Sequence, residues 1–343
     1  VKNLVLMGIR HITVCDLDRI ENSNLARCIF FRESDEGQLK AEVLAKRAME
    51  LNPDVRVIPV VGDVRLKLGL GDFIDADLAL GGLDNREARM YVNQACWKTS
   101  TPFIDGAIEG LMGAVKVFLP PHTACYECTM SERDHELVAA RRTCALLSRE
   151  EMLAGKVPTT ATSSSVVAAI QVQEAVKLLH RDRLGDPTLA GAAYNFNGLT
   201  HDSYVVQFTQ REDCLVHDTY DFEQGEVLPA DGPLSAALDK ARALLGPDAI
   251  VELEQEVLLG ASCTECGIDR EVLRPVDALS EGDGVCPQCG KEMRLDFTHA
   301  VSDGSPLLNR SIIELGLPAN DALVARSGMD RVFFRTRPAG ASK

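Results

Sequence analysis

The chain has 343 residues, of which 45% are hydrophobic, so it is long enough for about two or three domains with a sizeable buried core. Its 51 acidic residues outnumber its 36 basic ones, and the net charge of −15 argues against nucleic acid or an anionic membrane as the main partner and suits a partner with a basic face. No apolar run approaches the roughly 20 residues that span a bilayer, and no signal peptide opens the sequence, so we expect a cytoplasmic chain without a membrane partner.

Strand-like and helix-like segments alternate over residues 11–120. Short, largely apolar segments predict strands at His11–Cys15, Val55–Val61, Ala76–Gly81, Pro102–Ile104 and Gly113–Leu119. Apolar residues three and four positions apart predict helices at Ala41–Leu51 and Glu87–Lys98. This alternation predicts an α/β fold with a parallel sheet that binds its ligand at the carboxyl ends of the strands.

The remaining segments predict a less regular second half. They are, in order, a mobile loop over residues 131–165, a helix from about Ser165 to His180, a strand at Tyr204–Phe208, a linker over residues 221–233 and a helix at Leu234–Leu245 that ends at Gly246. We therefore expect an α/β domain over residues 1–220 and a small strand-rich module over residues 234–300. Residues 301–343 form a tail or an extension of that module.

Charged side chains occur close to the ends of the predicted strands. Asp16 and Asp18 follow the first strand, and carboxylates at a strand end can hold ribose hydroxyls. Arg27 and Lys40 can neutralise phosphates, and Asp84 can share Mg²⁺ with those phosphates. Solvated turn carboxylates and a surface lysine would explain any one of these residues, but not the ordered set.

The ordered motifs D-x-D, S-N-L-x-R, G-Q-x-K and D-N-x-x-x-R, which run from Asp16 to Arg89, resemble the ThiF/MoeB/HesA superfamily, to which ubiquitin-activating enzymes belong. The resemblance covers roughly residues 1–220 and implies a Rossmann-like, mostly parallel sheet that uses ATP and Mg²⁺. The nucleotide-binding residues that it implies are Asp16, Asp18, Asn24, Arg27, Lys40, Asp84 and Asn85. It also implies catalytic roles for Arg27 and Arg89.

The superfamily places a further strand and a glycine-rich phosphate loop upstream of the first of these motifs. Neither is present in this sequence, which begins at Val1. We therefore expect an N-terminal truncation and a sheet that lacks its first strand.

Most of the eleven cysteines have metal-ligand spacing, which favours zinc over disulfides in a reducing compartment. The two predicted ligand sets are Cys125, Cys128, Cys214 and His217 in the first domain, and Cys263, Cys266, Cys286 and Cys289 in the module. In the second set, 19 residues separate two C-x-x-C pairs, as in a structural zinc ribbon. In the first set, the resembled family often has a second C-x-x-C pair, and His217 replaces its last cysteine.

Four cysteines remain: Cys15, Cys28, Cys96 and Cys144. Cys15 falls on a predicted strand and Cys96 on an apolar helix, so we expect both to be buried and inert. Cys144 lies in the predicted mobile loop after two arginines, which favour the thiolate. Thioester-forming members of the superfamily carry their catalytic cysteine in the loop before the last long helix. The resemblance therefore implies Cys144 as a transfer nucleophile, with Cys28 next in line.

Together these features predict an adenylyltransferase that activates the C-terminal carboxylate of a ubiquitin-like or sulfur-carrier β-grasp protein and then forms a thioester on Cys144. An alternative is adenylation alone, with sulfur transfer elsewhere, as in molybdopterin or thiamine biosynthesis. The resemblance also implies a homodimer. The extra C-terminal module is a candidate docking surface for the carrier or for a downstream conjugating enzyme.

Two further alternatives belong to other classes of protein. A non-catalytic scaffold subunit is favoured by the absence of the glycine loop, but the intact residues Arg27, Lys40 and Asp84 oppose it. An NAD(P)-dependent oxidoreductase shares the fold class, but it does not explain the motif that ends in Lys40 or the Asp84-Asn85 pair.

Overall fold

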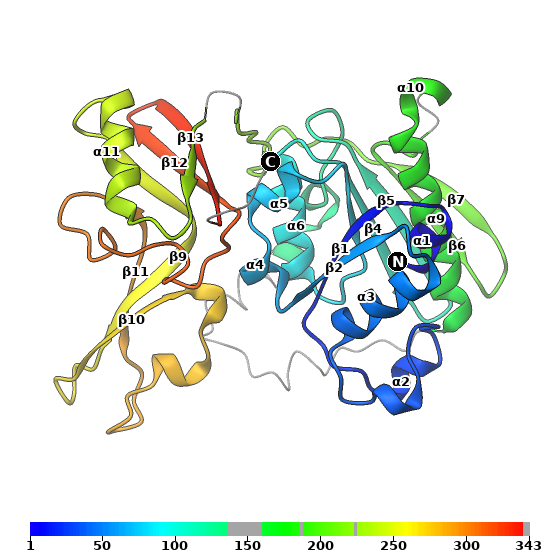
Figure 1. Cartoon of the computed structure of the whole chain (residues 1–343), viewed down its shortest axis with the longest axis horizontal. Coiled ribbons are helices and arrows are strands. Elements are labelled where there is room, and N and C mark those ends of the chain that lie inside the picture. Colours follow the sequence, from blue (N-terminus) through cyan, green and yellow to red (C-terminus); the bar gives the residue numbers. More distant parts are fainter. Residues whose placement is uncertain (136–159, 186–187, 223–224, 339–343) are drawn as a thin grey trace. The chain divides into compact units, whose positions relative to one another are not determined.

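A computed structural model describes residues 1–135, 160–185, 188–222 and 225–338 of the chain. These residues form two compact units (Figure 1). Unit 1 comprises the described residues of the ranges 1–67, 76–131 and 160–219, and unit 2 comprises those of 68–75, 132–135 and 220–338. Within these residues, no helix is long and apolar enough to cross a membrane.

Unit 1 alternates strands and helices, as the sequence predicts. Its first half contains α1 (Lys2–Leu6), β1 (His11–Asp16), α2 (Asn22–Leu25), α3 (Lys40–Leu51), β2 (Arg56–Val61), α4 (Val64–Lys67), β3 (Ala79–Gly81), α6 (Arg86–Lys98) and β4 (Phe103–Glu109). Its second half contains β5 (Met112–Phe118), α9 (Ala161–Leu179), α10 (Arg181–Leu184), β6 (Ala192–Asn197) and β7 (Ser203–Gln207). Every strand and helix predicted for this part of the chain is confirmed, although α9 begins four residues earlier than expected. The elements α2, α4, α10 and β6 were not predicted.

The strands of unit 1 form two separate sheets. Strands β1 and β2 pair in parallel in one sheet, and the other sheet has the order β3-β4-β5-β6-β7. The parallel pairing that the sequence predicts is confirmed for β1–β2 and β3–β4. From β4 to β7 the pairing is antiparallel. For β4 and β5 the reason is that the turn from Glu109 to Met112 is too short for a parallel crossover.

Helix α9 covers the middle of the larger sheet. Its side chains Val167, Ala175 and Leu178 pack against Ile104 of β4 and the buried valines of β5. The Thr160 side chain caps this helix by accepting a hydrogen bond from the N–H of Ser163 at 3.1 Å. A second apolar cluster packs α3 against β1 and β2. The two helices α3 and α9 thus each cover a face of one of the sheets.

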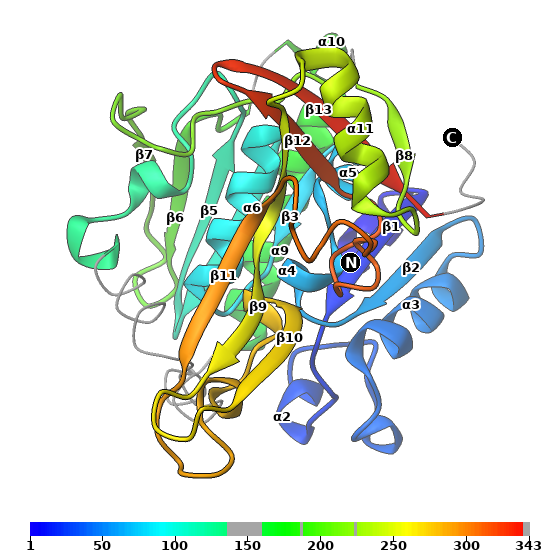
Figure 2. The same ribbon diagram turned by 90° about the vertical axis from the view of Figure 1, so that its left-hand side faces the viewer.

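Unit 2 is a mostly antiparallel sheet with one long helix. It contains β8 (Val227–Pro229), α11 (Leu234–Leu245), β9 (Ile250–Ser262), β10 (Asp269–Pro275), β11 (Arg294–Val301), β12 (Ala322–Ser327), β13 (Asp330–Arg337) and, from the first part of the sequence, α5 (Leu70–Ile74). The long strand β9 pairs with β11 along one edge, whereas β12 and β10 share its other edge (Figure 2). The helix α11 has the predicted bounds and ends at Gly246.

The residues around the predicted module also belong to this sheet. Strand β8 lies in the predicted linker and pairs in parallel with β13. Strands β12 and β13 lie in the predicted tail, which also supplies Leu307 and Leu315 to the main core of unit 2. Residues 301–338 therefore share the sheet and the core of unit 2.

Candidate functional site

Two carboxylates of the predicted nucleotide set lie near one another in unit 1. Asp16 ends β1, and Asp84 follows β3 by three residues. Burial raises the pKa of Asp16, and the negative charges of Asp18 and Asp84 raise it further. Two features lower the pKa of Asp16. The N–H of Asp18 donates a hydrogen bond to Asp16 Oδ1 at 2.9 Å, and Lys40 carries a positive charge. The carboxylates of Asp16, Asp18 and Asp84 therefore act on one another at this edge of the fold, and their charges favour binding of a cation.

The predicted phosphate ligand Lys40 reaches the same edge. It opens α3, and its Nζ lies 2.7 Å from Asp18 Oδ2. The backbone N–H of Lys40 also donates to the Asp18 carbonyl at 3.0 Å. The ammonium is 17% exposed and its partner carboxylate 43%, so the ion pair is open to solvent on one side.

Asn24 and Arg27 differ in their surroundings. Asn24 is buried in α2, and its Oδ1 accepts a hydrogen bond from the N–H of Glu21 at 3.0 Å, which closes the turn before this helix. Arg27 donates only to the carbonyl of Ser23, at 3.1 Å, and within the described part of the chain it forms no ion pair. The structure therefore gives Asn24 a local structural role and leaves the Arg27 guanidinium available to an anion.

Asn85 begins the helix that follows Asp84. Its side-chain oxygen accepts a hydrogen bond from the N–H of Ala88 at 2.8 Å, which caps α6. Its Nδ2 donates to Asp84 Oδ1 at 3.1 Å. Asn85 thus orients the Asp84 carboxylate and starts the helix at the same time.

Arg89, predicted as a catalytic residue, lies in a buried network. Its Nε donates to Asp105 Oδ1 at 3.1 Å, and its Nη2 donates to the carbonyls of Leu83 and Gly106. The Asp105 side chain is 1% exposed. Burial raises the pKa of Asp105, while the positive charge of Arg89 lowers it. Because Leu83 directly precedes Asp84, Arg89 holds the loop that carries the predicted metal ligand.

Sequence reasoning missed two residues of this edge. Asp105 is a charged residue in the apolar run of β4, and Gln171 is a polar residue in the apolar helix α9. The Nε2 of Gln171 donates to the carbonyls of Gly81 at 2.7 Å and Ile104 at 3.2 Å. Their position inside apolar segments could have indicated them, because a polar side chain that is buried with such a segment needs a hydrogen-bond partner.

Removing the Arg89 side chain should destabilise unit 1. We expect Arg89→Ala to lower the free energy of unfolding by about 3 kcal/mol or more, because Asp105 then stays buried without a cationic partner. Trp97, the only tryptophan, is buried in unit 1, so its fluorescence during urea unfolding reports on this unit. The control Arg211→Ala removes an exposed ion pair with Asp213 and should leave the unfolding midpoint unchanged. Equal midpoints for the two variants would contradict the role given to the buried pair.

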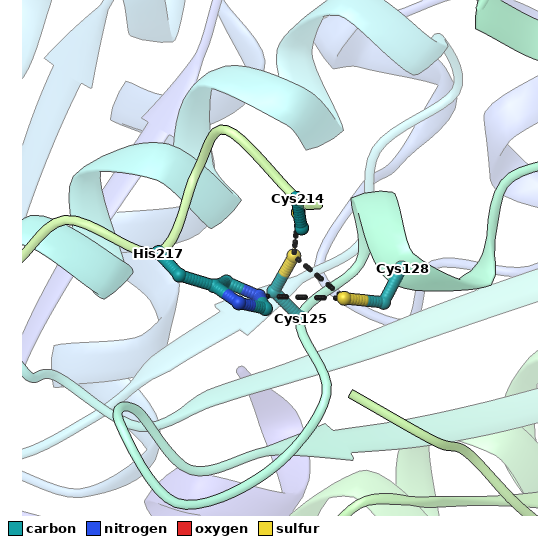
Figure 3. A group of neighbouring side chains, drawn as sticks. All are labelled: Cys125, Cys128, Cys214 and His217. Carbon is teal, nitrogen blue, oxygen red and sulfur yellow. Dashed lines mark hydrogen bonds between the residues drawn. The ribbon is translucent and has the colours of Figure 1, made fainter. Parts of the chain in front are cut away.

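The first predicted metal set comes together in unit 1. The side chains of Cys125, Cys128, Cys214 and His217 converge on one another, and their ligand atoms all lie within 4.8 Å (Figure 3). The Sγ of Cys125 lies 3.7 Å from those of Cys128 and Cys214, and the Sγ of Cys128 lies 3.3 Å from Nε2 of His217. Sulfur ligands about 2.3 Å from a tetrahedral zinc lie about 3.8 Å apart. The distances fit a bound zinc and are too long for a disulfide.

The surroundings of this set also suit a metal centre. His217 stacks on Trp97 with ring centroids 4.2 Å apart, and burial lowers the pKa of His217, which favours the neutral imidazole that binds metals. The Nδ1 of His217 lies 3.2 Å from the side-chain amide of Gln210, so the ring orientation is held from its far side. The N–H of Arg211 donates to the Sγ of Cys128 at 3.4 Å, so the backbone also contacts this sulfur.

The second predicted metal set comes together in unit 2. Its members Cys263, Cys266, Cys286 and Cys289 also have ligand atoms within 4.8 Å of one another. The N–H of Gly267 donates to the Cys263 carbonyl, and the N–H of Gly290 donates to the Cys286 carbonyl, each at 2.9 Å. Both glycines have positive φ, +66° and +70°. The two C-x-x-C turns therefore have the same backbone geometry, which presents both pairs of thiols to one centre.

The remaining cysteines differ in their suitability as nucleophiles. Cys144 lies outside the described residues. Burial raises the pKa of Cys28, which packs beside the apolar cluster of α3 and β1, so its thiolate fraction is low. Burial also raises the pKa of Cys96, and Cys15 donates from Sγ to the Gly62 carbonyl at 3.4 Å. The expectation that Cys96 is buried is confirmed, whereas Cys15 is partly exposed.

Comparisons with known proteins identify the family of the first part of the chain. The model of the ThiF family matches residues 1–216. The NEDD8-activating enzyme E1 catalytic subunit of Arabidopsis thaliana is 39% identical over 142 residues, which are 38% of this chain and 31% of that protein. The SUMO-activating enzyme subunit 2 of Dictyostelium discoideum is 38% identical over 128 residues, 37% of this chain and 19% of that protein.

Among solved structures, E. coli MccB with ATP resembles this chain with a TM-score of 0.50 and 22% identity, over 63% of this chain and 61% of MccB. At that identity the likeness shows a shared fold. The matched segment spans less than a third of the Arabidopsis and Dictyostelium relatives, at 31% and 19% of their lengths.

Proposed function

Since the chain belongs to the ThiF family, we propose that unit 1 binds ATP and adenylates the C-terminal carboxylate of a ubiquitin-like or sulfur-carrier protein. The observation that carries the proposal is the convergence of Asp16, Lys40 and Asp84 near the carboxyl ends of β1 and β3. Ligands of open α/β sheets bind at that edge. The names of the NEDD8- and SUMO-activating relatives support a small protein as the substrate, and MccB with ATP supports the nucleotide.

The side chains of this edge fit a magnesium nucleotide. Asp16 would hold ribose hydroxyls, Lys40 and Arg27 would hold phosphate oxygens, and Asp84 would be a ligand of Mg²⁺. The ion would neutralise phosphate charge during the reaction. Burial and the nearby Asp84 charge raise the pKa of Asp16, so a cation at this edge relieves a repulsion that is already present. Asn85 orients Asp84 through the hydrogen bond between their side chains.

The proposed reaction brings two anions together. An oxygen of the carrier carboxylate attacks the α-phosphorus of ATP, a bond forms between that oxygen and the phosphorus, and the bond from that phosphorus to the diphosphate oxygen breaks. The products are an acyl-adenylate and diphosphate. Lys40 and Arg27 offset the repulsion between carboxylate and phosphate, and their charges act most strongly as negative charge shifts to the leaving group. Arg89 acts through the Leu83 carbonyl and is a positioning residue.

Adenylation should depend on Lys40 and Asp84. We expect Lys40→Ala and Asp84→Ala each to reduce carrier-dependent ATP–diphosphate exchange by about tenfold or more, because each removes a charge that stabilises the transition state. The matched controls are Lys46→Ala on the exposed face of α3 and Asp54→Ala in the exposed turn after it. Both controls should keep the wild-type rate. Near wild-type exchange in both site variants would contradict the proposed roles of Lys40 and Asp84 in adenylation.

The second proposed step forms a thioester on Cys144, which lies outside the described residues. Its thiolate attacks the acyl carbon of the adenylate, a C–S bond forms and AMP leaves. We expect Cys144→Ser to abolish the reducible carrier adduct, or to leave a more stable ester, with ATP–diphosphate exchange almost unchanged. A thiol-sensitive adduct in Cys144→Ala would assign the step to another cysteine. No adduct in the wild type would leave adenylation as the only reaction.

We also propose that each ligand set binds one structural zinc. Metal analysis of the purified protein should give about two equivalents, because each set offers four ligands to a tetrahedral ion. Cys286→Ser and Cys214→Ser should each lose one equivalent. Only Cys214→Ser should change the fluorescence of Trp97, which stacks on His217. The control Cys28→Ser should keep both ions, and a single equivalent in the wild type would leave the set in unit 1 unsupported.

A further inference from the structure

One polar side chain interrupts the apolar face by which α9 covers the larger sheet of unit 1. Val167, Ala175 and Leu178 of that face are buried against β4 and β5. Gln171 lies four residues after Val167 and four before Ala175, so it shares their face of the helix. An amide on such a face costs free energy unless its polar atoms find partners. The position of Gln171 therefore indicates a specific hydrogen-bonding role.

The partners of Gln171 are backbone carbonyls of two neighbouring strands. Its Nε2 donates to the carbonyl of Gly81 at 2.7 Å and to that of Ile104 at 3.2 Å. Gly81 is the last residue of β3, and Ile104 lies in β4, which pairs with β3 in parallel. A single amide of α9 therefore ties the carboxyl end of β3 to the adjacent strand.

Two glycines of the sheet allow α9 to approach this closely. A Cβ atom on Gly106 of β4 would lie 2.5 Å from Gln171 Oε1, and one on Gly113 of β5 would lie 2.4 Å from Cγ2 of Val167. An alanine at Gly106 would therefore displace the Gln171 amide, and one at Gly113 would displace Val167. The missing side chains leave the space that the amide needs to reach the backbone of the strands.

Gln171 and Arg89 approach the same end of the sheet from opposite faces. Successive residues of a strand point to opposite faces of a sheet. In β4, Asp105 binds Arg89 of α6 on one face, and the next residue, Gly106, makes room for Gln171 on the other. The contact of Gln171 is therefore separate from the buried ion pair, and each of the two helices holds the sheet on its own side.

The carbonyl that Gln171 holds begins the short loop to Asp84. Only Gly82 and Leu83 separate Gly81 from Asp84. Glycine has the most backbone freedom of all residues, and a Cβ atom on Gly82 would meet no atom of the described residues within 4 Å, so packing does not restrict this position. The hydrogen bond from α6 to the Leu83 carbonyl fixes one end of the loop, and the one from Gln171 fixes the other. A shift at either end moves the Asp84 carboxylate.

We propose that Gln171 is a positioning residue for the metal ligand of the nucleotide site: its amide fixes the end of β3 and thereby the place of Asp84. The inference rests on the proposed role of Asp84 as a ligand of Mg²⁺. This ion requires nearly ideal octahedral geometry, so a small displacement of one carboxylate weakens its binding. Asp16, the proposed ribose ligand, ends β1 in the other sheet, so the loss of Gln171 should weaken metal-dependent binding only.

The test replaces Gln171 and, as a matched control, a glutamine on the opposite, exposed side of α9. Gln171→Met removes the amide and keeps the length of the side chain, and Gln171→Glu keeps its shape but replaces the donor by a carboxylate. The control is Gln173→Met. Calorimetric titration of the full chain with ATP, once in excess Mg²⁺ and once in excess EDTA, gives two dissociation constants. The fluorescence of the buried Trp97 during urea unfolding shows whether each variant folds.

We expect both Gln171 variants to fold and to raise the ATP dissociation constant in Mg²⁺ by about tenfold, because groups that orient a metal ligand contribute about 10–100-fold to metal affinity. The dissociation constant in EDTA should stay within about twofold of wild type, since Asp16, Arg27 and Lys40 are unchanged. A residue with a purely structural role would not produce this difference, because a weakened fold impairs both measurements. The control Gln173→Met should match wild type in both.

The outcomes separate this inference from the proposed function. Asp84→Ala is the reference and should remove most of the gain in ATP affinity that Mg²⁺ provides. If it does so while both Gln171 variants keep the wild-type gain, the positioning role is overturned and the role of Asp84 stands. Equal losses in Mg²⁺ and EDTA, or failure of both variants to fold, would assign Gln171 to the fold alone and also overturn the positioning role. If Mg²⁺ gives the wild type no gain, the proposed role of Asp84 fails, and that of Gln171 fails with it.

Discussion

The buried ion pair between Arg89 and Asp105 is the constraint on which the carboxyl edge of unit 1 depends. Asp105 is 1% exposed, and a buried carboxylate without a cationic partner would cost several kcal/mol. The fold must therefore keep α6 against β4 at the position where Arg89 reaches Asp105. Because α6 begins directly after Asp84 and Asn85, that requirement also fixes where the Asp84 loop ends. Arg89 Nη2 also donates a hydrogen bond to the carbonyl of Leu83, which fixes the position of the residue before Asp84.

The two ion pairs at this edge differ in a way that suits different tasks. The pair of Lys40 with Asp18 is partly exposed and contributes at most about 1 kcal/mol to stability. A phosphate can therefore take over the Lys40 ammonium at small cost to the fold. The pair of Arg89 with Asp105 cannot be exchanged in this way, because either partner would remain buried and charged. The rigid pair supports the site, and the open pair is the one available to a ligand.

Local sequence patterns were sufficient to predict most strands and helices of unit 1 and the members of both clusters of candidate metal ligands. The spacing of Cys125 and Cys128 predicted a partner pair far along the chain, and the structure brings Cys214 and His217 to them. Asp105 and Gln171 were missed because their partners lie on other elements, and a local pattern does not show which element packs opposite. The membership of α5 in unit 2 was missed for the same reason. Its five residues predict no particular location, and Asn320 and Arg335, which hold it, come about 250 residues later.

The two cysteine sets would depend on the proposed metal to different degrees. The set in unit 1 lies against a large aromatic core that includes Trp97, Phe103 and Phe118. Packing against this core stabilises the loops that carry the set even without an ion. The set in unit 2 lies where β9, β10 and β11 extend beyond the main core, and its own cluster has only four buried residues, of which Cys263 and Cys286 are two. So small a cluster cannot offset the entropy of ordering the two turns and the chain between them. A structural zinc contributes about 10–16 kcal/mol in zinc-finger peptides, so the proposed ion in unit 2 would take the place of a hydrophobic core.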